Sequence, residues 1–173
     1  MSVVHEFMAR MKERRDRSDG GFPRTIEVDD GVVRVHVRLL DEDRFTFLLD
    51  RIEVVRLASG PDGSVENRVT AQAEFLPKRL TYLLEDLTVT ELDHPHDRAQ
   101  LRSTAPDLRD GASCFYEVIL DQGRAVSLVR CRYDQTSGVK STTPLVMTIE
   151  ILGRVLDDLT AALWVEPLFS RSA

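Results

Sequence analysis

The sequence predicts an α+β protein: a curled antiparallel β-meander of seven or eight strands, with an N-terminal helix and a long C-terminal amphipathic helix packed on the sheet. Two observations lead to this fold class. Between about residues 24 and 133, apolar residues recur at every second position in segments separated by Gly, Asp and Pro, which is typical of strands that bury one face. Near both ends of the chain the apolar period becomes helical, and an apolar sheet face needs helices to cover it.

Length and composition limit the class of protein. The 173 residues are 42% hydrophobic and 30% charged, which fits one domain with a real core. We expect an N-terminal helix or arm over 1–18, a single α+β domain over 22–168 and a tail over 169–173. The net charge of −6 argues against a nucleic-acid partner. No apolar run approaches the ~18 residues of a membrane span, and the basic N-terminus lacks the apolar stretch of a signal peptide, so we expect a cytoplasmic protein.

The first helix is predicted over residues 2–17. Val4, Phe7, Met8 and Met11 fall at the spacing of one helical stripe, and Ser2 is a suitable N-cap. We expect this stripe to dock on protein, either on the rest of the chain or on a second copy. A homodimer through this helix is therefore one partner that the sequence suggests.

The first hairpin is predicted around Asp30-Gly31. This dipeptide favours a two-residue turn in which both central residues have positive φ. Such a loop places Val28 opposite Val33, Ile26 opposite Val35, and Glu27 opposite Arg34. Apolar side chains then meet apolar ones and opposite charges meet.

The next segments continue the meander. A turn is expected over 41–43, and a change of phase near Asp50-Arg51 predicts a bulge in the third strand, which ends at the turn 60–63. Alternation of Val69, Ala71, Ala73 and Phe75 predicts a fourth strand that ends at Pro77. Residues 80–86 fit either a helical turn or a bulged strand. A strand over 87–92 follows, then a loop-rich stretch with a short strand near Leu101.

The last hairpin joins 114–120 to 124–133, and two registers compete for it. A two- or four-residue loop places Cys114 opposite Cys131 and Tyr116 opposite Val129. A three-residue loop, Asp121-Gln122-Gly123, moves Arg130 onto the apolar side beside Tyr116. A one-residue slip exchanges the two faces, so the apolar pattern favours the first register. We therefore expect Cys114 and Cys131 to be reduced cross-strand neighbours.

The final helix is predicted to begin at Pro144, with Thr143 as its N-cap. Its apolar stripe extends for about five turns through Leu145, Ile149, Leu152, Leu156, Leu159 and Leu163. A strand at its beginning, through Val146 and Thr148, is the alternative. Pro167 ends the helix.

Two groups of basic side chains are the candidate ligand- or anion-binding residues. Arg34, His36 and Arg38 lie on one face of a predicted strand, and Arg130 and Arg132 lie on one face of another. Guanidinium groups bind phosphate or carboxylate, so the five residues would form one site if the two strands present them on the same face. The solvated side of a one-faced sheet explains the same alternation.

The sequence indicates neither a metal site nor a cofactor. Asp93-His94-Pro95-His96-Asp97 offers two imidazoles, which suit a transition metal, but no third ligand is evident and we expect a solvated turn. The two cysteines form no CxxC motif, and no nucleophile elbow, phosphate loop or dinucleotide-binding motif is present. The sequence therefore predicts no catalytic residues.

The expected function is that of a non-enzymatic module. Its curled sheet and long helix would bind a small apolar ligand or a partner protein in an apolar pocket or groove. One alternative is an enzyme at the mouth of the sheet that uses His36 with arginines, or His94 and His96 with a metal. The other is an assembly or chaperone-like subunit that dimerises through Val4, Phe7 and Met8.

Overall fold

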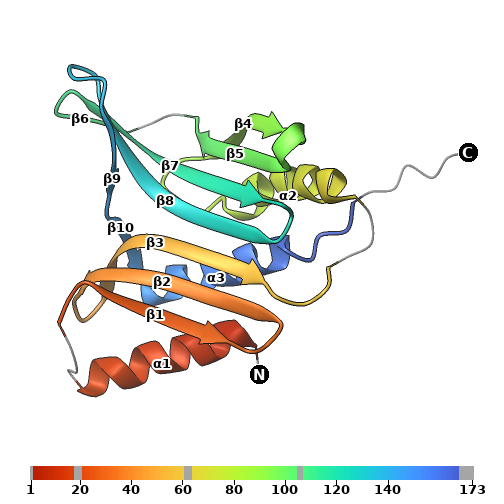
Figure 1. Cartoon of the computed structure of the whole chain (residues 1–173). Coiled ribbons are helices and arrows are strands. Elements are labelled where there is room, and N and C mark those ends of the chain that lie inside the picture. Colours follow the sequence, from red (N-terminus) through yellow and green to blue (C-terminus); the bar gives the residue numbers. More distant parts are fainter. Residues whose placement is uncertain (1, 18–20, 61–63, 105–106, 168–173) are drawn as a thin grey trace, which may run out of the picture.

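The computed structural model describes residues 2–17, 21–60, 64–104 and 107–167 of the chain. The described residues form three α-helices and a ten-stranded antiparallel sheet that is not closed (Figure 1). The α+β class, the antiparallel sheet and the helices packed on it are confirmed. The number of strands is ten where seven or eight were predicted, and the predicted tail, 169–173, lies outside the described residues.

The sheet departs from a simple meander after its third strand. Its order is β1 (Arg24–Asp29), β2 (Val33–Glu42), β3 (Thr46–Arg56), β8 (Ala125–Asp134), β7 (Ala112–Asp121), β5 (Arg98–Ser103) and β4 (Leu87–Asp93). Three short strands lie off this path: β6 (Asp107–Arg109) pairs with β7, β9 (Lys140–Thr143) with β8, and β10 (Leu145–Thr148) with β3. One end of β3 pairs directly with β8, whereas its other end pairs with β10. The sheet therefore divides at this end, where β9 and β10 run between β8 and β3 (Figure 1).

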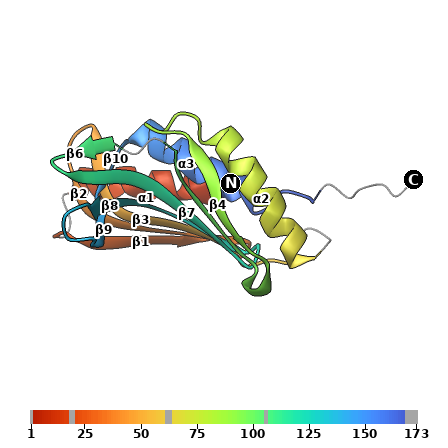
Figure 2. The same ribbon diagram turned by 90° about the horizontal axis from the view of Figure 1, so that it is seen from above.

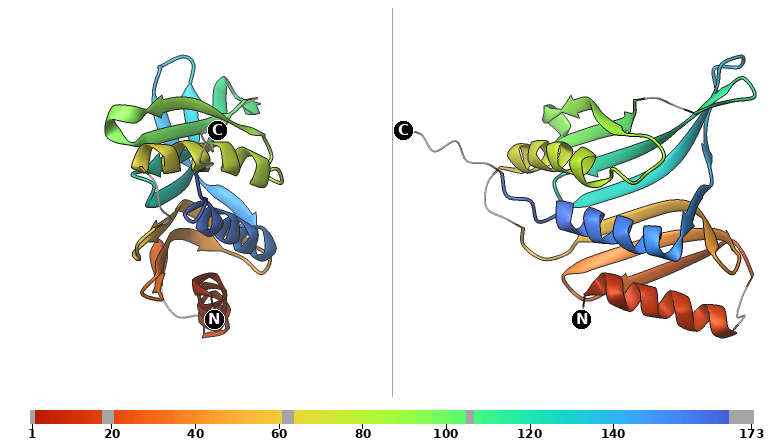
Figure 3. Two further views of the ribbon diagram at one scale, coloured as in Figure 1. Left: turned by 90° about the vertical axis from the view of Figure 1, so that its right-hand side faces the viewer. Right: turned by 180° about the vertical axis from the view of Figure 1, so that it is seen from behind.

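The helices form a second layer on one face of the sheet, called here the inner face (Figure 2). Helices α1 (Val3–Arg17), α3 (Ile149–Ala162) and α2 (Val65–Arg79) lie side by side on that face (Figure 3). The core between the layers contains fully buried side chains from several strands, among them Val35, Ile52, Leu101 and Leu128. The opposite, outer face carries the alternating polar residues.

Helix α1 docks on its own chain, as the apolar stripe predicted. Val4, Phe7 and Met11 are buried, and the helix contacts β1, β2 and α3. The hydroxyl of Ser2 accepts a hydrogen bond from the backbone N–H of His5 at 3.2 Å, which is the predicted cap. Its apolar stripe is thus already covered within one chain.

The first hairpin has a different register from the predicted one. Val28 pairs with Val35, Ile26 with Val37, and Asp29 with Arg34. The loop is longer because the Asp30 carboxylate accepts the backbone N–H groups of Val32 and Val33 at 2.9 and 2.8 Å, and within the loop only Gly31 has positive φ. The predicted register is wrong by two residues, a shift that keeps every side chain on its predicted face.

The bulge predicted in β3 is confirmed. Arg38 pairs with Arg51 and Leu39 with Leu49, so Asp50 is the extra residue. The bulge brings Leu49 and Ile52 to the same buried face although their spacing is odd. The preceding turn lies over 43–45 rather than 41–43, because the Asp43 carboxylate binds the backbone N–H groups of Phe45 and Thr46.

The strand predicted over 69–75 is wrong, because these residues belong to helix α2. Val69, Ala73 and Leu76 are buried at helical spacing, and Val69 and Ala73 also satisfy the period of two that predicted a strand. Ser64 caps the helix by accepting the N–H of Asn67 at 3.2 Å, and Pro77 lies in the last turn instead of preceding it. Most of the turn predicted over 60–63 lies outside the described residues.

The two strands predicted between α2 and the last hairpin are present: β4, and β5 around Leu101. Residues 81–86 form an irregular turn, which is neither the helical turn nor the bulged strand expected for 80–86. None of the described helices has the length and apolar character needed to cross a bilayer.

The register predicted for the β7–β8 hairpin is wrong by one residue. Gln122 and Gly123 both have positive φ, and the N–H of Arg124 donates to Asp121 at 3.0 Å, which closes a tight turn. Arg124 is then an extra residue, and Asp121 pairs with Ala125. The shift by one residue exchanges the faces of β8 relative to β7.

The predicted pairing of the two cysteines is a consequence of that wrong register. Cys114 lies opposite Arg132, whereas Cys131 lies opposite Phe115. The two thiols are therefore on opposite faces of the sheet, and both are buried and free.

The C-terminal helix begins later than predicted. Thr143 ends β9, Pro144 forms the corner, and α3 begins at Ile149 with Thr148 as its N-cap. The initial strand that the sequence left as an alternative is present as β10. The leucine stripe from Leu152 to Leu163 is buried as predicted.

Candidate functional site

A groove of about 560 Å³ opens where the sheet divides, between inward-pointing side chains of β7 and β8 and side chains of β3 and β10 that point away from the core. Its walls come from β3, the turn 81–86, β6, β7, β8, β9 and β10. The lining residues are Leu48, Leu84, Asp107, Cys114, Tyr116, Arg130, Arg132, Thr143, Pro144 and Val146. We call this the inner groove. Its volume is within the range of small-molecule sites.

The apolar side of the inner groove is exposed to solvent. Leu84 on the turn 81–86 is 78% exposed, and Val146 on β10 is 63% exposed. Leu48 on β3 pairs with Val146 and continues the same wall. Large exposed apolar side chains that gather around a hollow indicate a surface that is covered by something else.

The polar side of the inner groove is built on a buried ion pair. Arg130 donates two hydrogen bonds to the Glu85 carboxylate, at 2.9 and 3.1 Å, and both side chains are about nine-tenths buried. The guanidinium also lies over the ring of Tyr116, 4.5 Å from its centre. Burial acts to lower the pKa of Arg130, but the hydrogen bond to Glu85 and the charges around it leave that pKa raised, so Arg130 remains a cation.

This ion pair fastens the turn 81–86 to the sheet. The Ser103 hydroxyl donates to Glu85 at 3.3 Å, and a backbone hydrogen bond joins Leu84 to the Tyr116 side chain. Burial is the main cause that raises the pKa of Tyr116, so its phenol stays protonated around neutral pH. The turn, and with it the exposed Leu84, is therefore held at the edge of the inner groove.

Arg132 is the second cation of the inner groove. It is half-buried, lies opposite Cys114 and Ser141 across the strands, and makes no ion pair within 4 Å with any residue in the described part of the chain. Its guanidinium therefore remains available to an anionic group, unlike that of Arg130, which Glu85 already binds.

The five predicted binding residues do not form one site. Val35 and Val37 point into the core, so Arg34, His36 and Arg38 between them lie on the outer face, whereas Arg130 and Arg132 lie on the inner face. Arg34 binds Asp29 at 2.8 Å, and Arg38 lies 3.4 Å from Asp50. The β2 group and the β8 group could form one site only if both strands presented them on the same face. The register of β8 against β7 places the β8 arginines on the inner face instead.

His36 and Arg38 of the outer-face group border a shallow hollow of about 590 Å³. This hollow is lined by Pro23, Arg24, Thr25, His36, Arg38, Asp50, Arg51 and Glu53. Its cations face carboxylates of the same surface, so it is a mixed-charge, solvated region rather than a cationic cradle.

The histidine segment forms a short 3₁₀ turn, η1 (His94–His96), at the surface. Nδ1 of His96 lies 2.8 Å from Asp93, whereas Nδ1 of His94 lies 3.2 Å from Glu66 of α2. The two rings thus bind different carboxylates. Among the residues described in the structure, no group of three or more His, Cys, Asp or Glu side chains has the arrangement of a metal site.

The described lining of the inner groove contains no histidine, and its Tyr116 phenol is protonated and hydrogen-bonded. Sequence reasoning missed Glu85 and Tyr116 as parts of the site. The sequence contained one indication of this ion pair. In one of the two registers considered, Arg130 lies on the apolar side of the hairpin, and a buried arginine on an apolar face requires a carboxylate partner.

Comparison of the chain with family models, with curated proteins and with solved structures finds no match. The function is therefore inferred from the geometry of the chain alone.

Proposed function

We propose that this protein is a non-enzymatic binding module and that the inner groove holds a small, largely apolar ligand. The observation that carries the proposal is the combination of exposed apolar side chains, Leu84 and Val146, with a hollow of about 560 Å³. Burial of apolar surface is the main source of affinity in such sites, and a few polar groups orient the ligand. Arg132 at the same groove favours a ligand that carries one anionic group.

An anionic, environment-sensitive dye tests this proposal. 1-Anilinonaphthalene-8-sulfonate has an apolar body and one negative charge, and its fluorescence rises in apolar sites. We expect saturable binding with one site per chain. Leu84→Glu removes apolar surface and adds a negative charge that repels the anionic dye. It should therefore weaken dye binding at least about tenfold, a loss of about 1.4 kcal/mol in binding free energy. Arg132→Gln should weaken the binding of this dye more than that of an uncharged analogue.

Leu108→Glu is the matched control. Leu108 lies on β6, is 68% exposed, and points to the outer face beside Ser113. The same substitution there changes charge and apolar exposure by similar amounts but leaves the inner groove intact. Equal losses in Leu84→Glu and Leu108→Glu would contradict the proposal, because they would show binding to exposed apolar surface in general.

Native mass spectrometry of the purified protein separates this proposal from its alternatives. A co-purified small molecule that is lost in Leu84→Glu supports the inner groove. A stoichiometric metal that is lost when His94 and His96 are replaced would favour the enzyme. An apo dimer that dissociates when Val146→Glu is introduced would assign the exposed apolar residues to a protein contact instead.

A further inference from the structure

Strand β4 ends the open sheet on the side of α2. It comes last in the strand order, beyond β5, and no strand in the described part of the chain pairs with its far edge (Figure 1). A strand at a sheet edge presents a row of backbone N–H and C=O groups that another extended segment can bind. We call this free side of Leu87–Asp93 the β4 edge.

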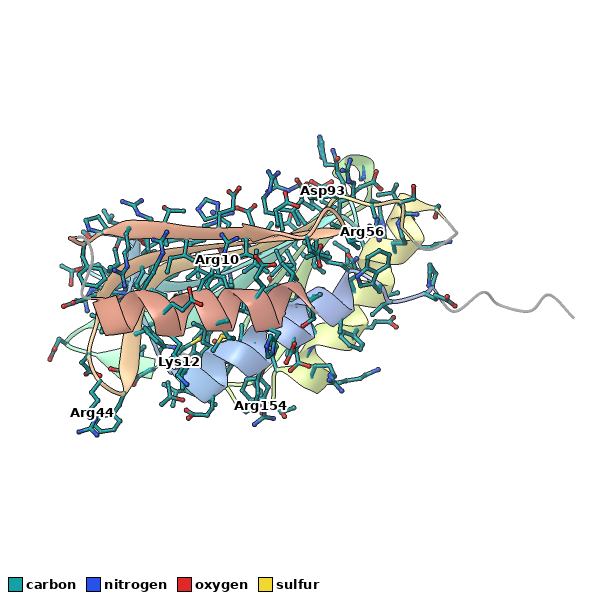
Figure 4. The ribbon with its side chains drawn as sticks, turned by 90° about the horizontal axis from the view of Figure 1, so that it is seen from below. Arg10, Lys12, Arg44, Arg56, Asp93 and Arg154 are labelled. Carbon is teal, nitrogen blue, oxygen red and sulfur yellow. The ribbon has the colours of Figure 1, made fainter. Side chains whose placement is uncertain are left out.

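The opposite edge of the sheet, β1, is protected. Helix α1 contacts β1, and Arg10, which Figure 4 shows between α1 and the sheet, donates to the backbone carbonyl of Glu27 at 3.2 Å. A long charged side chain that covers backbone groups in this way blocks the addition of a strand. On β4 the hydroxyl of Thr90 donates in the other direction, to the carbonyl of Gln100 in β5 at 3.1 Å, and does not cover the β4 edge.

The inner side of β4 is an apolar surface that the helices cover only in part. Val89 lies opposite Leu101, and Leu92 lies opposite Ala99. Leu101 and Ala99 are 0% and 3% exposed, whereas Val89 and Leu92 are 38% and 40% exposed although α2 contacts β4. A bulge at Thr90 keeps both apolar side chains on this side of the strand. An added strand would complete the burial of Val89 and Leu92.

The outer side of β4 carries two carboxylates beside a small hollow. Asp93 is bound by His96, whereas Glu91 is exposed and makes no ion pair within 4 Å with any residue that the structure describes. The hollow has a volume of about 190 Å³ and is lined by Glu91, Asp93, Arg98, Ala99, Gln100 and Ile119. Its cation, Arg98, lies 3.5 Å from Asp121. Glu91 is therefore available to a cation that approaches along the β4 edge.

We propose that the β4 edge binds an extended segment of a partner protein in which apolar and basic side chains alternate. The segment adds one strand to the sheet: its apolar side chains cover Val89 and Leu92, and a Lys or Arg on its other face reaches Glu91. Charge selects this occupant. Residues 87–97 contain acidic residues but no Lys or Arg, so a second copy would bring an equally acidic edge and like charges would meet. The β4 edge is separate from the inner groove and does not depend on the function proposed for it.

A fluorescein-labelled peptide of alternating Lys and Val residues is the probe. We give it seven residues, the length of β4, and measure its affinity by fluorescence anisotropy. We expect saturable binding of one peptide per chain that weakens as salt is added. A peptide with Glu in place of Lys should bind at least about tenfold more weakly. Equal affinities of the two peptides would overturn the assignment to a basic partner.

Methylation of the peptide backbone tests the addition of a strand. In an added strand, one set of alternate N–H groups points to β4 and the other set points to solvent. Of two peptides N-methylated on one set or the other, one should lose binding and the other should retain it. Equal affinities of the two methylated peptides would overturn strand addition.

Hydrogen exchange measured by mass spectrometry locates the peptide. The peptide should slow amide exchange in residues 87–93 and leave residues 24–29, at the opposite edge, unchanged. Protection of the turn 81–86 and of β10 in place of β4 would assign the peptide to the inner groove and overturn the proposal.

Variants test the charge and the occupant. Glu91→Lys should weaken binding of the Lys-Val peptide about fivefold or more, because an attraction becomes a repulsion. The matched control is Glu27→Lys, the same change at a 49% exposed outer-face position of β1, which should leave the affinity unchanged. Wild-type affinity in Glu91→Lys, or an equal loss in Glu27→Lys, would overturn the proposal. Sedimentation of the chain alone completes the test, because a dimer that dissociates in Leu92→Lys would assign the β4 edge to a second copy instead.

Discussion

Breaking the ion pair between Glu85 and Arg130 should destabilise the protein strongly. Both side chains are about nine-tenths buried, and their contact is bidentate. Glu85→Leu leaves a buried cation with no carboxylate, and the loss of one partner from such a pair costs about 3–5 kcal/mol. Arg130→Met leaves the buried Glu85 carboxylate and should cost a similar amount.

The double variant, Glu85→Leu with Arg130→Met, should recover most of that loss. It replaces two buried charges by apolar side chains of similar size, and such exchanges are commonly neutral or stabilising. We expect the free energy of unfolding of the double variant to lie within about 1 kcal/mol of wild type, which makes the coupling energy of the cycle several kcal/mol. Urea unfolding followed by circular dichroism measures all four proteins, and m-values that stay constant confirm that the unfolded states are comparable.

The control for this cycle is the exposed pair of Arg10 and Glu6 on α1. Their nitrogen and oxygen lie 2.8 Å apart, as close as in the buried pair, but the side chains are 48% and 41% exposed. Glu6→Gln should therefore cost only about 0.3–0.5 kcal/mol. Two results would refute the reasoning: a loss below about 1 kcal/mol for Glu85→Leu, or a double variant whose loss equals the sum of the single losses.

Three further predictions concern the pH dependence and the packing of the fold. Burial is the main cause that raises the pKa of Tyr82 in the folded protein, and the hydrogen bond to Asp158 is the second. The phenol therefore loses its proton at a lower pH in the unfolded chain than in the folded one. The free energy of unfolding should accordingly fall as pH rises above about 10. Urea unfolding at stepped pH should show a shallower fall in Tyr82→Phe, and an identical slope would contradict this linkage. Phe7→Ala empties a fully buried position under α1 and should cost about 3–5 kcal/mol by the same assay; a loss below about 1 kcal/mol would show that α1 is not part of the core. Gly31→Ala forces a φ of +83° on a residue with a side chain and should cost about 1–2 kcal/mol, whereas no loss would mean that the loop changes its conformation.

Periodicity predicted the faces of the fold better than its topology. The stripe of α1, the bulge at Asp50 and the strands around Val89 and Leu101 follow from the pattern, because burial of one face dictates it locally. Helix α2 was missed because Val69 and Ala73 satisfy both periods. The pairing of β3 with β8 depends on contacts between distant segments, which a local pattern does not contain. The inner groove was harder to predict, because it depends on a polar side chain placed where the pattern requires an apolar one.

The extra residue Arg124 explains why the polar side of the inner groove escaped the pattern. Its insertion after the turn at Gln122-Gly123 shifts β8 by one position against β7, which turns Arg130 and Arg132 to the inner face and lets Glu85 bind the first of them. The carbonyl of the same residue accepts a hydrogen bond from the backbone N–H of Arg56, which joins the end of β3 to the turn. Such an extra residue is favourable only if the charged side chains that it turns toward the inner face find partners there, because a buried unpaired charge costs several kcal/mol. Glu85 supplies that partner for Arg130 at the inner groove, where the two side chains form a bidentate contact.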